Sequence, residues 1–218
     1  MKTPLPRRKL LAAALLLAPV DALFGPRLPG EGPASAQAQS ASIPPGLFDD
    51  PASPVAGNPK GTVTIVEFFD YRCSYCRAMQ PLLRDALKQH RQVRLVFKDW
   101  PIFGGVSVSA ARVALAANWQ GKYLPVHDAL FKLPLGMTDD NVRAAAQNAG
   151  LDMKKLDQDL TERAAEIDAI LARNDKEAQA LKFQGTPGFV VGNTLVPGAL
   201  SKQALETLIA RASPANGG

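Results

Sequence analysis

The sequence has 218 residues and a formal net charge of +5, and its 46% hydrophobic and 21% charged residues are typical of one globular domain, with or without an insertion. No cluster of basic residues with interleaved aromatics is present, so the sequence gives no support to nucleic-acid binding. Only two cysteines occur, which limits the chain to one intrachain disulfide.

Residues 1–36 have the pattern of a signal peptide. Basic residues at 7–9 precede an apolar run, Leu10–Val20, whose 11 residues are too few to span a bilayer. Ala34-Ser35-Ala36 fits a cleavage site, and Arg7-Arg8 also permits twin-arginine export. The alternatives are an uncleaved anchor or a disordered tail. We expect export to the periplasm, with a mature chain of net charge +2, because the segment holds five basic and two acidic residues.

The next part of the chain predicts a strand, a helix and a second strand. Residues 37–60 are rich in Pro, Ser, Ala and Gly, which indicates an extended lead-in. Thr62–Phe69 and Val93–Lys98 are dense in β-branched and apolar residues and predict two buried strands. Between them, Ser74–His90 has apolar residues at helical spacing, with Pro81 expected to kink the helix. This order is typical of a βαβ unit with parallel strands.

The middle of the chain predicts helices and no strand. The expected helices are Ser107–Trp119, Tyr123–Lys132, one from Thr138 to Gly150, and a single long charged helix over Asp152–Lys182.

The last part of the chain returns to strands. Phe189–Val191 and Thr194–Val196 flank a Gly-Asn turn and predict a hairpin, which is followed by a helix over Ser201–Arg211. Residues 213–218 are expected to be a disordered tail. The order of elements is therefore βαβ, a helical block, and ββα, which is an α/β fold.

The chemistry of the chain is expected at Cys73-Ser74-Tyr75-Cys76, a C-x-x-C motif between a buried strand and a helix. The reactive form of cysteine is the thiolate, and the unpaired N–H groups at a helix N-terminus favour that anion. Cys73 is therefore predicted to be the exposed nucleophile. Cys76 lies one turn later and would be the resolving thiol.

Two other uses of the cysteines have little support in the sequence. A structural zinc site needs four ligands, and the two histidines lack the paired spacing of a zinc finger. His127 is interpreted as a packed or surface residue. A purely structural disulfide across so short a loop would constrain the unfolded chain very little. We therefore expect no metal site and no bound cofactor.

Two stretches of the sequence resemble the DsbA family of thioredoxin-fold proteins, near the subgroup of DsbA-like proteins that includes ScsC. They are Val66–Cys76, which reads VEFFDYRCSYC, and Gly185–Asn193, which reads GTPGFVVGN. The resemblance runs from Gly57 to Ala210. It implies a thioredoxin-like domain made of residues 61–106 and 184–212, with an all-helical insertion over residues 107–183.

The resemblance also implies roles for four further residues. Pro187 matches the cis-proline that faces the redox pair, and Thr186 precedes it. Glu67 matches a buried acid beneath the site, which could relay the proton of the resolving thiol. Lys98 matches a lysine that often pairs with this acid. The alternative is that Glu67 and Lys98 are only charges at strand edges.

The motif departs from the family's most oxidising members, which carry Pro-His where this chain has Ser74-Tyr75. Tyr75 cannot supply the positive charge of a protonated histidine, so we expect a less strongly lowered pKa for Cys73. The same most oxidising members have a valine at the position of Thr186. The hydroxyl of Thr186 can reach the active-site sulfur.

The resemblance implies a thiol:disulfide oxidoreductase that forms or reshuffles disulfides in reduced or unfolded exported proteins. It would be reset by a membrane redox partner, either DsbB-like or DsbD-like. The lead-in contains no heptads, so a monomer is expected. The alternative is a periplasmic copper-handling or assembly protein that binds Cu(I) through the same two thiolates.

Overall fold

The computed structural model describes residues 43–214 of the chain. The predicted signal peptide lies outside the described residues, as do residues 37–42 of the lead-in and residues 215–218 of the tail. Among the described residues, no helix is long and apolar enough to cross a membrane.

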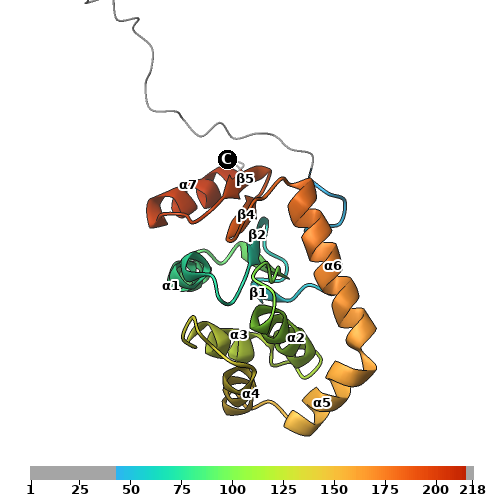
Figure 1. Ribbon diagram of the computed structural model, residues 1–218. Coiled ribbons are helices and arrows are strands. Elements are labelled where there is room, and N and C mark those ends of the chain that lie inside the picture. The colour runs from blue at the N-terminus through green and yellow to red at the C-terminus, as the bar shows by residue number, and fades with distance from the viewer. Residues whose placement is uncertain (1–42, 215–218) are drawn as a thin grey trace, which may run out of the picture. The chain divides into compact units, whose positions relative to one another are not determined.

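The described residues form one five-stranded sheet in the order β1-β3-β2-β4-β5 (Figure 1). Strands β2 and β3 are parallel and are connected by helix α1, as the βαβ pattern predicts, and all other neighbouring strands are antiparallel. The bounds are β1 Val55–Gly57, β2 Val63–Phe69, α1 Ser74–Gln89, β3 Val93–Asp99, β4 Gly188–Val191 and β5 Thr194–Pro197. Strand β1 was not predicted, because three residues carry no readable alternation.

Five helices are inserted between β3 and β4, and a last helix follows β5 (Figure 1). This arrangement confirms the expected thioredoxin-like fold with a helical insertion. The helices are α2 Val106–Asn118, α3 Tyr123–Phe131, α4 Asp139–Asn148, α5 Met153–Glu162, α6 Ala164–Ala180 and α7 Lys202–Ala212.

The prediction of one long helix over Asp152–Lys182 is wrong, because the chain bends at Arg163. This residue ends α5 and precedes α6, with a φ of −107°. Its guanidinium lies 4.8 Å from the centre of the Trp119 ring. The bend allows Leu156 of α5 and Ile167 of α6 to be fully buried in the same core.

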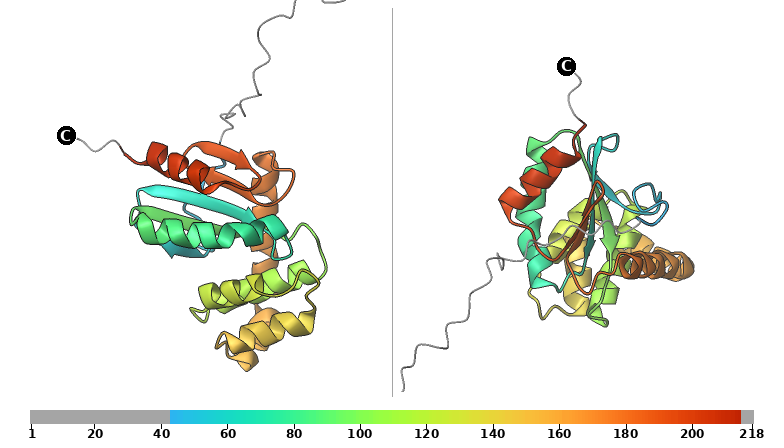
Figure 2. Two further views of the ribbon diagram at one scale, coloured as in Figure 1. Left: turned by 90° about the vertical axis from the view of Figure 1, so that its left-hand side faces the viewer. Right: turned by 90° about the horizontal axis from the view of Figure 1, so that it is seen from above.

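The sheet separates two hydrophobic cores. In the right-hand view of Figure 2, α1 and α7 lie on one side of the sheet and α6 lies on the other. Side chains alternate between the faces of a strand, so Ile65 and Phe69 of β2 enter the core on the α1 side. Val66 and Phe68 enter the smaller core on the other face, which includes Ala178 of α6. This alternation decides on which face of the sheet each buried charged side chain lies.

Lys98 lies on the α6 side, so the expected pairing of Lys98 with Glu67 is wrong. In the register of β2 and β3, Lys98 is beside Phe68, whereas Glu67 is beside Phe97 on the α1 side. The Nζ atom of Lys98 is fully buried and lies 3.1 Å from a carboxylate oxygen of Asp50 and 2.8 Å from one of Glu177. The sequence did not indicate Asp50 and Glu177 as the partners of Lys98, because both residues are distant from Lys98 along the chain.

Substituting Lys98→Ala should destabilise the fold without changing the thiol chemistry. The change leaves two largely buried carboxylates without their shared cation, and breaking a buried pair in this way costs about 3 kcal/mol of unfolding free energy. Denaturant unfolding measures this loss, and Lys176→Ala on the exposed side of α6 is the matched control. A change in the pKa of Cys73 in the folded variant would contradict the placement of Lys98 on the opposite face.

Candidate active site

A tight turn after β2 places Cys73 at the start of α1. The side chain of Asp70 holds this turn, since one of its oxygens accepts hydrogen bonds from the Arg72 N–H at 2.8 Å and from the Ser107 hydroxyl at 2.8 Å. Its other oxygen accepts the Phe103 N–H at 3.1 Å. Asp70 thereby fixes the redox turn to the beginning of the helical insertion.

Cys73 is the N-cap residue of α1, and its sulfur serves as the capping atom. The Sγ atom accepts the backbone N–H of Cys76 at 3.3 Å and donates to the carbonyl oxygen of Thr186 at 3.2 Å. The hydrogen bond with the Cys76 thiol is the main cause that lowers the pKa of Cys73 from 9.0 to about 6, against the opposing effect of burial. The backbone N–H groups of Cys76 and Tyr75 lower the pKa further. Cys73 is buried, with 4% of its surface exposed, so its predicted exposure is wrong, and its sulfur is covered by the loop that holds Thr186.

Cys76 has the opposite acidity. Its side chain is fully buried, and burial is the main cause that raises the pKa of its thiol far above the usual range. The hydrogen bond with Cys73 and the negative charge of Glu67 act in the same direction. At neutral pH, the reduced pair therefore consists of a thiolate at Cys73 and a protonated thiol at Cys76.

Glu67 is fully buried on the α1 side of β2, as the resemblance implies. Burial is the main cause that raises its pKa from 4.5 to about 8, and the charges of Cys73 and Asp99 add to the rise. The amide of Gln80 opposes the rise by donating to one carboxyl oxygen at 3.5 Å. The other oxygen, Oε2, has no hydrogen-bond partner within residues 43–214. Glu67 can therefore exist in both protonation states close to neutral pH.

A loop after α6 faces the redox pair. The peptide bond Thr186–Pro187 is cis, as expected, and the Thr186 carbonyl contacts Cys73. The hydroxyl of Thr186 is buried and has no hydrogen-bond partner among the described residues. A groove of about 660 Å³ lies beside this loop and reaches the exposed ring of Tyr75. It is lined by Tyr75, Lys182, Gln184, Gly185, Thr186, Pro187, Pro197, Gly198 and Ala199.

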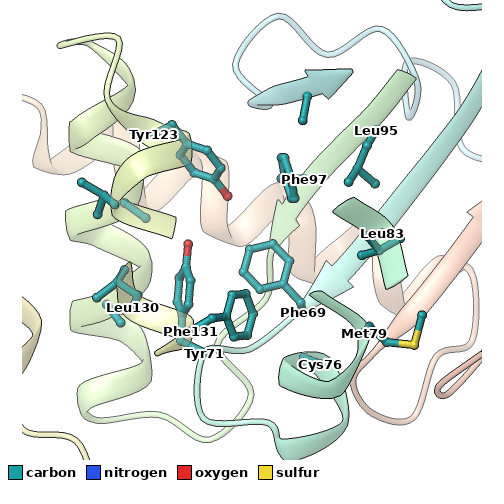
Figure 3. Close-up of a cluster of buried hydrophobic side chains, with 14 of the residues drawn as sticks. Phe69, Tyr71, Cys76, Met79, Leu83, Leu95, Phe97, Tyr123, Leu130 and Phe131 are labelled. Carbon is teal, nitrogen blue, oxygen red and sulfur yellow. The ribbon is translucent and has the colours of Figure 1, made fainter. Parts of the chain in front are cut away.

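Three buried polar side chains near the pair were missed by the sequence analysis. Gln80, His127 and Tyr71 form a hydrogen-bonded chain that ends at Glu67. Figure 3 shows the apolar surroundings of this chain, where Phe69 of β2 lies with Tyr71, Phe131 and Cys76 in one cluster. The spacing of His127 from Glu67 along the sequence does not indicate that the two residues lie close together. Only the burial of His127 between aromatic residues could have indicated where it lies.

Within the described part of the chain, no group of three or more His, Cys, Asp or Glu residues is placed to hold a metal ion.

Comparison with known proteins identifies the family. The model of the DSBA-like thioredoxin domain matches residues 64–210, which include both cysteines and the cis-proline. The chain belongs to the DSBA-like thioredoxin family.

Three solved structures are similar to this DSBA-like protein. A thioredoxin-like oxidoreductase from Silicibacter pomeroyi DSS-3 is 44% identical with a TM-score of 0.70, over 76% of this chain and 95% of the other. A periplasmic thioredoxin-like protein from Salmonella enterica serovar Typhimurium is 32% identical with a TM-score of 0.65, over 76% and 92%. The catalytic domain of Proteus mirabilis ScsC is 27% identical with a TM-score of 0.69, over 76% and 92%.

The curated relatives of this DSBA-like protein are much longer proteins. The Na(+)/H(+) antiporter NhaA 1 from Salinispora arenicola is 26% identical over 160 residues, which make up 72% of this chain and 24% of the antiporter. The chain thus spans about a quarter of the length of the curated relatives that it matches.

Titration of the reduced DSBA-like protein should show one thiolate forming with a midpoint near pH 6. Substituting Cys76→Ala should raise this midpoint, because it removes the hydrogen bond that contributes most to the lowered pKa of Cys73. Ultraviolet absorbance of the thiolate measures both values, with Cys73→Ala as the blank. A wild-type midpoint near 3.5, the value of the strongly oxidising DsbA, would contradict the structure.

Proposed function

We propose that this chain is an exported thiol:disulfide oxidoreductase that forms or reshuffles disulfides in periplasmic or secreted proteins. The observation that carries the proposal is the asymmetry of the two thiols. Cys73 has a pKa lowered to about 6, whereas burial raises that of Cys76, so attack and resolution fall to different sulfurs. The similar periplasmic protein from Salmonella enterica supports the location, as does the signal-peptide pattern.

The proposed oxidation of a substrate proceeds in two exchanges. A substrate thiolate attacks the Sγ atom of Cys73 in the oxidised pair, and the bond between Cys73 and Cys76 breaks. Cys76 leaves with the electron pair and takes a proton, for which Glu67 is the adjacent donor. A second substrate thiolate then attacks the substrate sulfur of the mixed disulfide. Cys73 leaves as its stabilised thiolate, and the substrate has lost two electrons and two protons.

The reduced pair must return these electrons to another protein before the next oxidation. We propose a membrane redox partner of the DsbB type, which accepts the electrons, for this step. For work as an isomerase or reductase, we propose instead a partner of the DsbD type, which donates electrons and keeps the pair reduced. Isomerisation needs no net electron transfer, because attack by the Cys73 thiolate on a wrong disulfide is followed by attack of another substrate thiol on the mixed disulfide.

The groove beside the cis-proline loop is the proposed site for the substrate chain. Its lining includes Thr186 and Pro187, so a bound polypeptide would pass next to the sulfur of Cys73. Tyr75 is 66% exposed, which leaves an aromatic ring available for apolar substrate side chains. Such a surface favours unfolded proteins as substrates, because folded proteins bury most of their apolar residues and cysteines.

Disulfide transfer to a reduced, unfolded protein tests the proposal. The oxidised wild-type protein should remove two substrate thiols for each pair that becomes reduced, and Cys73→Ala should be inactive. Cys76→Ala, mixed instead with a substrate that already contains a disulfide, should accumulate a mixed disulfide through Cys73, because the thiol that releases Cys73 is missing. Thiol quantification and mass spectrometry follow the three reactions.

Transfer no faster than that of Cys73→Ala would contradict the proposal. In that case, stoichiometric binding of Cu(I) by the reduced pair, and its loss in Cys73→Ala, would support a copper-handling protein instead.

A further inference from the structure

A chain of hydrogen bonds runs from the helical insertion to the carboxyl group of Glu67. The Tyr71 hydroxyl lies 3.1 Å from Nδ1 of His127, and Nε2 of His127 lies 3.1 Å from Oε1 of Gln80. Nε2 of Gln80 lies 3.5 Å from Oε1 of Glu67 and 3.5 Å from the carbonyl oxygen of Cys76. The chain thus connects α3 to the two groups that exchange a proton in the proposed function.

The donors of this chain all point in one direction. The Gln80 amide nitrogen faces two acceptors, Glu67 and the Cys76 carbonyl, so its oxygen must face His127. His127 then carries its proton on Nε2 and donates to that oxygen, which leaves Nδ1 to accept from the Tyr71 hydroxyl. Each side chain orients the next one toward Glu67.

The surroundings keep His127 neutral, which this arrangement requires. Its ring lies among the aromatic rings of Phe69, Tyr71, Phe97 and Phe131, with centroid separations from 4.6 to 5.6 Å. Burial, and then the charge of Arg84, lower its pKa to about 3. A protonated ring would carry a donor on both nitrogens, so the Tyr71 hydroxyl would have to accept from Nδ1 instead of donating to it.

We propose that His127 is a positioning residue that locks the Gln80 amide with its N–H toward Glu67 and so sets the pH at which Glu67 accepts the proton of Cys76. The inference rests on the proposed function, since it concerns the same proton transfer. Without His127, the Gln80 amide is free to rotate and present its oxygen to Glu67, where two acceptors would repel each other. The carboxylate would lose its one hydrogen-bond donor among the described residues.

Other titratable groups also face Glu67 and influence its pKa. They are Cys73 and Cys76 from α1 and its N-cap, Asp99 from the end of β3, and Tyr71 from the turn after β2. The β4 neighbour, Phe189, is apolar. All of these groups remain in a His127 variant, so a shift in that variant reports on the hydrogen-bonded chain.

The test is a single turnover of the reduced protein with oxidised glutathione, quenched in acid and resolved by mass. Attack by Cys73 forms the mixed disulfide, and attack by Cys76 then releases glutathione, so the two steps are observed separately. In the wild type, the rate of the second step should rise with a midpoint near pH 8, the pKa of Glu67. His127→Phe should move this midpoint to higher pH and slow the second step at pH 7 by about tenfold, as expected for one lost hydrogen bond to a charged group.

Three further variants separate this effect from lost packing. Gln80→Leu removes the donor itself and should give the same shift, and the double variant His127→Phe with Gln80→Leu should shift no further. His127→Leu carries the same test if His127→Phe does not fold. Leu130→Ala is the control, because it leaves a cavity on the same helix and should destabilise the fold without moving the midpoint.

A wild-type midpoint in His127→Phe would overturn the inference, whether or not Gln80→Leu moves it. Glu67→Gln keeps this failure distinct from a failure of the proposed proton transfer. If Glu67→Gln abolishes the midpoint while the His127 variant retains it, Glu67 keeps its proposed role and only the positioning by His127 is wrong. If Glu67→Gln retains the wild-type profile, the proton transfer through Glu67 is wrong, and the inference falls with it.

Discussion

The sulfur of Cys73 caps the N-terminus of α1, and the chemistry proposed for this protein depends on that contact. An anion at this position meets unpaired backbone N–H groups and the positive end of the helix dipole. Cys76 lies one turn further along and is completely covered by the core, where an ionised sulfur would be costly. The boundary between β2 and α1 therefore creates two thiols of opposite acidity from the same residue type. The rest of the fold keeps this boundary in place.

The two faces of the sheet deal with buried charge in different ways. On the α6 side, the buried Lys98 is neutralised by Asp50 and Glu177, which is an arrangement that fixes structure. On the α1 side, Glu67 has neutral hydrogen-bonding neighbours and a pKa raised to about 8 by burial. A carboxyl group paired with a buried cation would remain ionised at neutral pH and could not give up a proton there. The separation of Lys98 from Glu67 is thus consistent with a role for Glu67 in proton transfer.

Most of the fold could be predicted from the sequence because its elements have strong local signals. The dense β-branched and apolar residues of β2 and β3, the apolar spacing of α1 and the Gly-Asn turn of the hairpin are all readable within a short window. The bend at Arg163 and the strand β1 were missed because tertiary contacts, not local propensity, decide them. The C-x-x-C pair and the cis-proline were found through a family motif.

The partners of Glu67 could not be predicted in the same way. Resemblance pointed to Lys98, but the one-residue difference in strand register sends the two side chains to opposite faces. Gln80 and His127 are 47 residues apart in the sequence and meet only when the insertion packs on α1. A single buried histidine in an apolar helix has no sequence pattern that distinguishes it from a packing residue.

The reduction potential of the Cys73–Cys76 pair, measured against glutathione buffers, is the most direct test of the account. A stabilised thiolate favours the reduced form and makes the pair more oxidising. With a pKa near 6 at Cys73, the potential should lie between about −270 mV for thioredoxin and about −120 mV for DsbA, whose nucleophilic thiols have pKa values of about 7 and 3.5. A potential at either extreme would contradict the claim that the environment of Cys73 sets the redox behaviour of this protein.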